Sequence, residues 1–237
     1  MQRSDLSAAV QIVRLTDAGM ARQMTEYCLY GVLHYQRQMD AYARQQRQHE
    51  WRPLDMCSAS DVRVTVLGLG ELGGQVAQAL SRLGYEVAGW SRRAKTVDGV
   101  RCLHGGSGLR ELLRQTDVLF CVLPATPETR HALDAETLAL LPDGAALINA
   151  GRGSLIDERA LLERLDGGHL RFALLDVFAE EPLPEDHPFW RHPRVIVTPH
   201  VAAATVPEET VRQIVANLAA QARGEPMNGV VDRRRGY

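Results

Sequence analysis

Hydrophobic residues along this chain follow two spacings, one typical of strands and one typical of helices. Residues 62–67 carry valine at every second position, which predicts a buried strand. The apolar residues that follow fall at steps of four, four and three, which predicts a helix with one apolar stripe: Leu72, Val76, Leu80 and Leu83. Gly84 is expected to end that helix in a left-handed conformation.

The same alternation of strand and helix patterns continues to the end of the chain. We expect strands over residues 86–90, 118–123, 145–149, 171–177 and 195–198. One helix ends within 138–141, and another is capped by Asp157, runs to Leu165 and ends at Gly167. A last helix starts at Pro207, and the residues expected to face inward are Val211, Ile214, Val215, Leu218 and Ala222. These repeated units predict an α/β fold with a doubly wound parallel sheet, whose ligands bind at the carboxyl ends of the strands.

A separate helical pattern precedes the first valine-rich strand. After a short strand at residues 12–15, Thr16 or Asp17 can cap a helix that continues to about Glu50 before Pro53 stops it. Its apolar seam consists of Met24, Cys28, Gly31, Tyr35, Met39 and Tyr42. Two interpretations stay open, a packed surface helix and a subunit interface, because Gly31 and the aromatic tips permit close helix contact.

Composition narrows the range of partners. The chain has 237 residues, of which 45% are hydrophobic, so it can bury a proper core. Its 27 basic and 29 acidic residues give a net charge of −2, which favours neither nucleic acid nor an anionic membrane as a partner. No apolar run approaches the roughly 20 residues that span a bilayer, and no signal pattern opens the chain. The four cysteines show no metal-ligand spacing, so we expect reduced thiols, no metal site and a cytoplasmic protein.

The stretch after the first strand has the spacing of a dinucleotide-binding turn, G-x-G-x-x-G. Gly68 would make the tight turn, Gly70 would let the backbone approach a pyrophosphate, and Gly73 would let the helix pack on the strand. Glu71 and Leu72 lie within the same turn, where the helix N-terminus would favour negative charge. The alternative is an ordinary glycine-rich turn.

The end of the second strand indicates which cofactor would bind. An acidic residue at this position would bond the ribose 2′-hydroxyl of NAD, and an arginine would accommodate the 2′-phosphate of NADP. The chain carries Ser91, Arg92, Arg93 and Lys95 there, with no acid among them. We interpret Ser91, Arg92 and Arg93 as a 2′-phosphate site, with NAD binding more weakly, against the alternative of a solvated basic turn.

Four further motifs follow strand ends in order along the chain. They occupy residues 123–129 (LPATPET), 149–153 (NAGRG), 176–184 (DVFAEEPLP) and 198–200 (TPH). Together with the glycine turn they resemble the D-isomer specific 2-hydroxyacid dehydrogenases. The GWSRR strand end and the tail VDRRRGY are most similar to the glyoxylate/hydroxypyruvate reductase A branch, which favours NADPH.

The resemblance implies three catalytic residues. Arg152 would hold the carboxylate and carbonyl of the substrate, His200 would donate a proton, and Glu181 rather than Glu180 would pair with His200. Elementary chemistry agrees, because a guanidinium binds a carboxylate bidentately and a carboxylate beside an imidazole favours its protonated form. Taken alone, each residue has a simpler explanation, a surface histidine or a solvated loop cation.

The resemblance also implies contacts with the cofactor and a reaction. Asp176 would lie at the carboxamide side of the nicotinamide, and further residues would line the cofactor: Leu123, Pro124, Thr126 and Ala150. Gly151 stands where the family commonly has alanine. The implied activity is NADPH-dependent reduction of small 2-oxo acids such as glyoxylate and hydroxypyruvate. The alternatives are a non-catalytic NADP-binding or interaction module and an inactive truncated fragment.

Family members usually begin with a flavodoxin-like substrate domain of roughly a hundred residues. The resemblance therefore predicts a dinucleotide-binding domain over residues 12–223, with residues 1–11 and 224–237 as remnants of the substrate domain. A cleft with one wall would bind cofactor and turn over slowly, because it cannot exclude water. Family members pair through the region of the first helix, so we predict a homodimer built largely on it.

Overall fold

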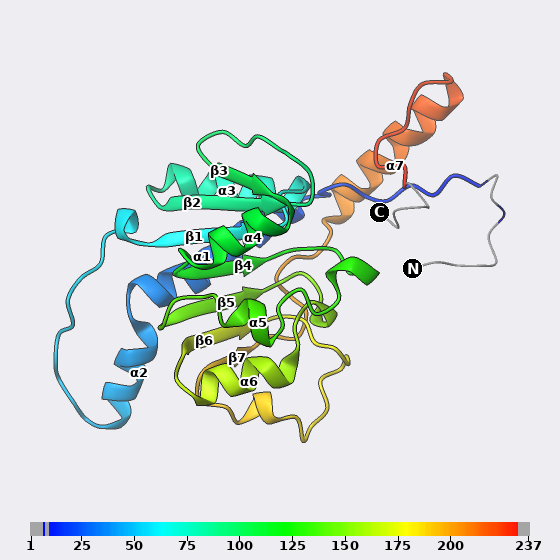
Figure 1. The fold of residues 1–237 in the computed structure, drawn as a ribbon. Coiled ribbons are helices and arrows are strands. Elements are labelled where there is room, and N and C mark those ends of the chain that lie inside the picture. Colours follow the sequence, from blue (N-terminus) through cyan, green and yellow to red (C-terminus); the bar gives the residue numbers. More distant parts are fainter. Residues whose placement is uncertain (1–6, 8–9, 232–237) are drawn as a thin grey trace.

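Parallel strands form a single sheet at the centre of the computed structural model, which describes residue 7 and residues 10–231 (Figure 1). Within those residues the sheet has seven strands in the order β3-β2-β1-β4-β5-β6-β7. Their bounds are Arg63–Leu67 (β1), Glu86–Ser91 (β2), Arg101–His104 (β3), Val118–Cys121 (β4), Ala145–Asn149 (β5), Leu170–Leu175 (β6) and Val195–Val197 (β7). Both β2 and β4 pair with β1, so the chain turns in opposite directions on the two sides of β1 and leaves a crevice at its carboxyl end. The doubly wound α/β prediction is confirmed.

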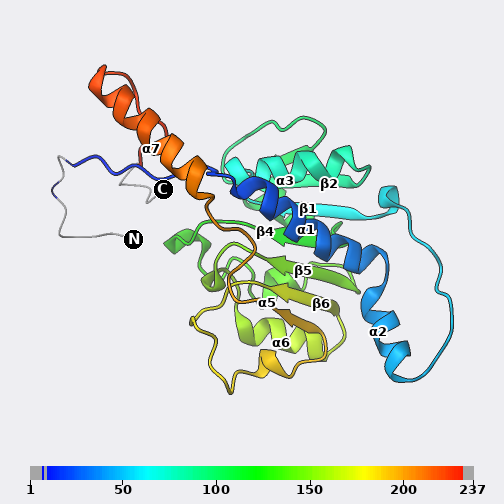
Figure 2. The ribbon, with the colours of Figure 1, turned by 180° about the vertical axis from the view of Figure 1, so that it is seen from behind.

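Helices cover both faces of the sheet, which explains why most residues of the central strands are buried (Figures 1 and 2). One face carries α1 (Met20–Gln36) and α3 (Glu71–Arg82), and the other carries α4 (Gly105–Leu113), α5 (Ala135–Leu138) and α6 (Glu158–Asp166). Each face has its own buried cluster, centred on Val64 and Ile148 on the first and on Leu119 and Leu147 on the second. The predicted caps of α6 are present, because the Asp157 side chain accepts two amide hydrogen bonds and Gly167 ends the helix.

The sequence patterns did not predict β3 or α4. Three glycines, at positions 105, 106 and 108, weaken the helical propensity of α4. Its formation is explained by tertiary packing, because Leu112 and Leu113 are fully buried and Gly108 lies against Leu103. Two other boundaries of the predicted units also differ: Leu83 is exposed rather than part of the apolar stripe of α3, and residues 12–15 supply only a single bridge, from Val13 to Val230.

The long N-terminal helix is two helices. The first, α1, ends at Gln36, and α2 (Met39–Arg47) begins after Gln38, whose φ of 54° breaks the helical path. The prediction of one helix to about Glu50 was therefore wrong, because a period of three to four residues continues across such a break. Gly31 packs inward, where a Cβ would lie 2.4 Å from Ile148 of β5, so its close contact is with its own sheet.

The last helix, α7 (Pro207–Ala222), projects away from the sheet, as Figures 1 and 2 show. The prediction that its apolar residues face inward was wrong, because none of its residues is buried. Four of them are exposed: Val211, Ile214, Val215 and Leu218. Amphipathic spacing predicts that one face is apolar, but it carries no information on what covers that face. Residues 223–231 fold back beside α7, where Arg14 donates to the carbonyl of Gly229.

Two segments that were interpreted from the sequence, the N-terminal segment and the tail motif, include residues that the structure does not describe. The tail motif falls on residues 231–237, of which 232–237 lie outside them, as do residues 1–6, 8 and 9 of the N-terminal segment. Among the residues that the structure describes, no helix is long and apolar enough to cross a membrane.

Candidate active site at the carboxyl edge of the sheet

The turn that follows β1 gives its three glycines different roles. Gly68 has a φ of +110°, a backbone conformation that residues with a side chain rarely adopt. A Cβ on Gly73 would lie 2.0 Å from the carbonyl oxygen of Gly68, so only glycine lets α3 pack this close. A Cβ on Gly70 would meet no protein atom within 4 Å. The space at Gly70 is therefore open, and the unpaired first-turn amides of α3 start beside it, which fits a dinucleotide pyrophosphate.

The basic segment after β2 reaches back to this turn. The Ser91 hydroxyl donates to the carbonyl oxygen of Arg93 at 2.7 Å and so fixes the segment, while the side chains of Arg92 and Arg93 are exposed. The ammonium of Lys95 donates to the carbonyl oxygen of Leu69, inside the glycine turn, at 2.6 Å. Lys95 therefore adds a cation between the two predicted phosphate sites. The sequence interpretation placed Lys95 in this segment but did not count it among the cofactor residues.

The loop after β5 holds Arg152 at the same edge of the sheet. Asn149 is fully buried, and its side-chain amide donates to the carbonyl oxygen of Arg152 at 3.1 Å. A Cβ on Gly153 would lie 1.8 Å from the carbonyl carbon of Phe178, which brings this loop against the one that follows β6. Arg152 itself is exposed, between two buried glycines. The packing of Gly153 thus sets the separation between Arg152 and the loop that carries Glu181.

Gly151 is tightly packed in the loop that carries Arg152. A Cβ at this position would lie 2.9 Å from the carbonyl oxygen of Leu123 and 2.9 Å from a methyl of Leu155. Such contacts are shorter than ordinary van der Waals distances, so glycine lets the Arg152 loop lie close to the chain that follows β4.

Glu181 and His200 are neighbours in the structure. The Glu181 Oε2 atom lies 2.8 Å from Nδ1 of His200, and Oε1 accepts the amide of Phe178 at 3.0 Å. Since an ionised carboxylate only accepts hydrogen bonds, Nδ1 of His200 must donate, which leaves Nε2 for a substrate. Both side chains are partly exposed, at 49% for His200 and 36% for Glu181, so a small molecule can reach them.

The environment of Glu181 keeps its carboxylate ionised. Burial raises the pKa of Glu181, but the hydrogen bonds from His200 and from the Phe178 amide, with the charges of His200 and Arg152, lower it by more. Its pKa therefore lies below the ordinary value for glutamate. The ionised carboxylate is therefore available at neutral pH as the acceptor for Nδ1–H of His200.

Asp176 takes part in a set of contacts that sequence patterns could not reveal. Its side chain is 1% exposed, and its carboxylate accepts hydrogen bonds from the Thr198 hydroxyl and from the amides of Val201 and Ala202. The predicted contact of Asp176 with the nicotinamide carboxamide stays a prediction. What the structure adds is that Asp176 holds the loop on which His200 lies.

The other predicted cofactor residues lie in the first turn of α3 or in the segments that follow β4 and β5. Glu71 is the first residue of α3 and accepts a hydrogen bond from Gln75, so its carboxylate lies along the helix. Thr126 caps a short 3-10 turn together with Thr129. Leu72 lies in the first turn of α3. Leu123 and Pro124 follow β4, and Ala150 follows β5.

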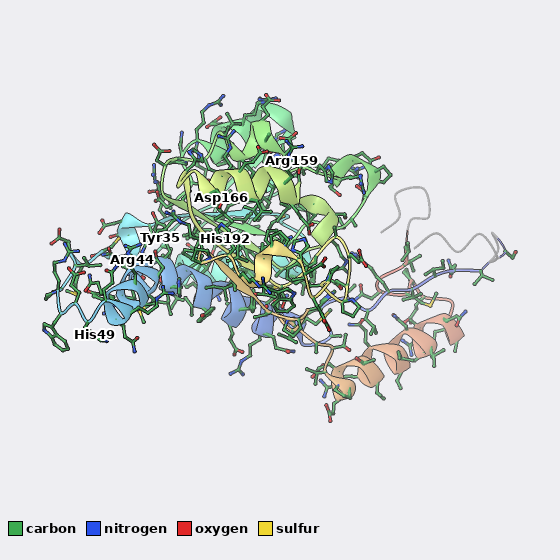
Figure 3. The ribbon with its side chains drawn as sticks, turned by 90° about the horizontal axis from the view of Figure 1, so that it is seen from below. Tyr35, Arg44, His49, Arg159, Asp166 and His192 are labelled. Atoms are coloured by element: carbon green, nitrogen blue, oxygen red, sulfur yellow. The ribbon has the colours of Figure 1, made fainter. Side chains whose placement is uncertain are left out.

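Three other histidine–carboxylate pairs occur among the described residues: His169 with Asp143, His187 with Glu158 and His192 with Asp166. His192 lies 3.2 Å from Asp166 of α6, and the two are labelled in Figure 3. His192 precedes β7, whereas His200 follows it, so the two histidines lie at opposite ends of a strand in a parallel sheet. Of these two histidines, His200 is the one at the edge where the glycine turn lies. Among the described residues, no group of three or more His, Cys, Asp or Glu side chains could hold a metal ion.

Comparisons with known proteins point to one family. A model of the D-isomer specific 2-hydroxyacid dehydrogenase NAD binding domain matches residues 29–202. A glyoxylate/hydroxypyruvate reductase A of Serratia proteamaculans is 47% identical over 232 residues, which are 98% of this chain and 74% of the reductase. The structure of a D-isomer specific 2-hydroxyacid dehydrogenase from Xanthobacter autotrophicus Py2 with NADPH and MES is similar with a TM-score of 0.95 and 43% identity, covering 99% of this chain and 97% of that one. An NADPH-dependent glyoxylate/hydroxypyruvate reductase from Sinorhizobium meliloti, in complex with NADP and sulfate, has a TM-score of 0.92 and 38% identity, covering 97% of this chain and 74% of that one.

Proposed function

The chain belongs to the D-isomer specific 2-hydroxyacid dehydrogenase family, and from this premise we propose that it reduces small 2-oxo acids such as glyoxylate and hydroxypyruvate with NADPH. The observation that carries the proposal is the contact of His200 with Glu181 at the strand edge that also holds Arg152 and the glycine turn. Two solved relatives, from Xanthobacter autotrophicus and Sinorhizobium meliloti, were determined with NADPH or NADP, which supports the same cofactor here.

Each of the three residues has a distinct task in this proposal. Arg152 binds the carboxylate of the 2-oxo acid and polarises its carbonyl. His200 donates a proton from Nε2 to the carbonyl oxygen, and ionised Glu181 accepts the hydrogen of Nδ1 and so orients the ring. A bound NADPH would supply the hydride. The glycine turn, Ser91, Arg92, Arg93 and Lys95 would hold its phosphates.

The direct test follows NADPH absorbance with glyoxylate and with hydroxypyruvate across pH. Reduction of either acid, saturable in acid and cofactor, is the expected result. Tight NADPH binding without reduction of either acid would instead favour a non-catalytic NADP-binding module, which is the alternative that the glycine turn alone supports. An absence of both binding and reduction would overturn the cofactor assignment as well.

We expect NADPH to bind about ten- to a hundredfold more tightly than NADH, because charge-assisted hydrogen bonds to the 2′-phosphate would be lost with NADH. Arg92→Asp should narrow or reverse this preference. Fluorescence titration of both cofactors measures it. Arg159→Asp, which makes the same charge change on α6, should leave the ratio unchanged. Equal dissociation constants for the two cofactors in the unsubstituted protein would sink the 2′-phosphate assignment.

Glu181→Gln should lower kcat for reduction throughout the neutral pH range. The lowered pKa of Glu181 keeps its carboxylate charged in that range, so the native protein offers Nδ1 of His200 a charged hydrogen-bond acceptor, whereas glutamine offers a neutral one. The measurement is kcat against pH for the two proteins. Glu180→Gln, at an exposed neighbouring carboxylate, is the matched control and should leave kcat unchanged. A profile for Glu181→Gln that coincides with the native one would contradict the pairing.

We propose that the chain forms a homodimer through the outer side of α1, α2 and the following segment. Large hydrophobic residues are exposed there: Tyr30, Leu33, Met39, Trp51 and Met56. The seam that contains Met24 and Cys28 is buried in the domain itself, so it is this outer side that is available for pairing. Light scattering at micromolar concentration should give twice the chain mass. Leu33→Asp should shift the mass toward one chain, whereas Leu83→Asp, at an exposed leucine after α3, should not. A monomeric native protein would refute the dimer.

A further inference from the structure

A line of hydrogen bonds connects α1 to the loop that carries His200. The phenol oxygen of Tyr27 lies 2.7 Å from the hydroxyl oxygen of Thr198, although the two residues are far apart in the sequence. The Thr198 hydroxyl in turn donates to Oδ1 of Asp176 at 2.6 Å. A threonine hydroxyl has one hydrogen, and a carboxylate only accepts, so that hydrogen belongs to the bond with Asp176. Tyr27 must therefore donate to Thr198.

Asp176 accepts hydrogen bonds from the backbone of His200 and of the two residues that follow it. The backbone carbonyl of Asp176 accepts the amide of His200 at 2.8 Å. Its carboxylate accepts the amides of Val201 at 2.8 Å and Ala202 at 2.9 Å. The backbone at His200 and just after it is thus hydrogen-bonded to one buried residue. The Asp176 carboxylate needs hydrogen-bond donors because burial removes it from water.

The conformation of His200 makes these ties necessary. Its φ is 57°, in the left-handed region that costs a residue with a Cβ about 1 kcal/mol or more. Such a conformation persists only where the surrounding contacts fix it. Here the contacts come from Asp176, and the orientation of the Asp176 carboxylate is set by Thr198 and, behind it, by Tyr27.

We propose that Tyr27 is a positioning residue for His200, acting through Thr198 and Asp176. The inference rests on the proposed function, since it concerns the placement of the proton donor. The hydrogen bond of Tyr27 goes to Thr198 rather than to Arg152, Glu181 or His200, and its part is to orient the Thr198 hydroxyl so that the hydrogen of Thr198 points to Asp176. Without the phenol, the Thr198 hydroxyl is free to rotate and the His200 loop is held less firmly.

The phenol of Tyr27 stays protonated wherever the reduction can be assayed. Burial raises the pKa of Tyr27, the hydrogen bond with Thr198 lowers it by less, and the negative charge of Asp176 raises it further, together with Tyr30. Tyr27 is therefore a donor at every pH of interest, and its effect is one of geometry rather than of its own titration.

The test compares Tyr27→Phe with Tyr85→Phe. Tyr85 is also a largely buried phenol, and it donates a single hydrogen bond of 2.7 Å to Gln36, so both variants lose one hydroxyl and one hydrogen bond. Amide hydrogen exchange of Val201 and Ala202 should accelerate about three- to tenfold in Tyr27→Phe only. In the same variant kcat should fall by a similar factor, with the affinity for NADPH unchanged.

Variants of Thr198 separate positioning from general loss of structure. Thr198→Ser keeps the hydroxyl and should retain native exchange at Val201 and Ala202, whereas Thr198→Val should accelerate it by at least as much as Tyr27→Phe. Adding Tyr27→Phe to Thr198→Val should have no further effect, because the link is already broken.

Two results would overturn the inference: native exchange at Val201 and Ala202 in Tyr27→Phe, or equal acceleration in Tyr85→Phe. The exchange measurement needs no turnover. If the unsubstituted protein reduces no 2-oxo acid, the proposed function fails while the coupling of Tyr27 to the loop is still decided by exchange.

Discussion

His200→Ala should lower kcat for 2-oxo acid reduction by about 10²–10⁴-fold, the range expected for removal of a positioned proton donor. The physical reason is that His200 is the only side chain among the described residues that is hydrogen-bonded to Glu181, and alanine leaves the developing alkoxide without a donor. NADPH affinity should change little, because the glycine turn and the basic segment after β2 lie apart from the imidazole in the sequence and on other strands. Steady-state kinetics give kcat, and a separate titration gives the affinity for NADPH. Each value is compared with that of the unsubstituted protein.

His192→Ala is the matched control for this prediction. His192 also pairs with a carboxylate, Asp166, but it lies at the amino end of β7. Its replacement should leave kcat within about twofold of the native value, because it lies at the end of β7 opposite to the site, whereas the loss of its hydrogen bonds with Asp166 and the Arg194 amide acts on stability. Unchanged turnover in His200→Ala would remove the proposed proton donor, and an equal loss in His192→Ala would attribute the effect to folding.

Gly153→Ala should lower kcat by about a hundredfold or more. A Cβ at this position would lie 1.8 Å from the carbonyl carbon of Phe178 and 2.0 Å from its oxygen, so the Arg152 loop and the loop leading to Glu181 must move apart. A displacement of about 1 Å between catalytic groups can cost about 10²-fold in rate. The same strain should lower the free energy of unfolding by about 1–3 kcal/mol. Kinetics and chemical denaturation measure the two effects.

Gly106→Ala controls for the added methyl group. A Cβ on Gly106 meets no atom within 4 Å, and the residue lies in α4, where alanine is the better helix former. This variant should keep native kcat and gain rather than lose stability. A Gly153→Ala protein with native kcat would show that the spacing of the two loops is not what fixes Arg152 relative to Glu181.

The central strands β4 and β5 were predictable because they are buried on both faces, so residues such as Leu119 and Ile148 appear in nearly continuous apolar runs. Two features that depend on tertiary contacts were not. The start of α4 is rich in glycine, and only its burial against the sheet makes it helical. The break at Gln38 leaves the helical period intact, so it has no signature in the spacing of apolar residues.

For the candidate site, position after a strand end brought Arg152, Glu181 and His200 to one edge, because parallel strands share their carboxyl ends. Their roles remain predictions. Side chains that act from within the protein were missed: Asn149 behind Arg152, and Tyr27 behind Thr198. Such contacts join residues distant in sequence, and nothing in a local motif indicates them. Lys95 did have a signal, since it stands four residues after Ser91 in the basic segment.

Lys95 gives the cofactor turn a chemical label of its own. It is the only lysine in the chain, and its ammonium lies on the carbonyl of Leu69 within the glycine turn. Apart from the terminal α-amine, an acylating reagent therefore has one primary amine to modify, and isotopic enrichment of lysine marks a single side chain. Footprinting or spectroscopy of that one amine can report occupancy of the turn directly, without turnover and without an engineered probe.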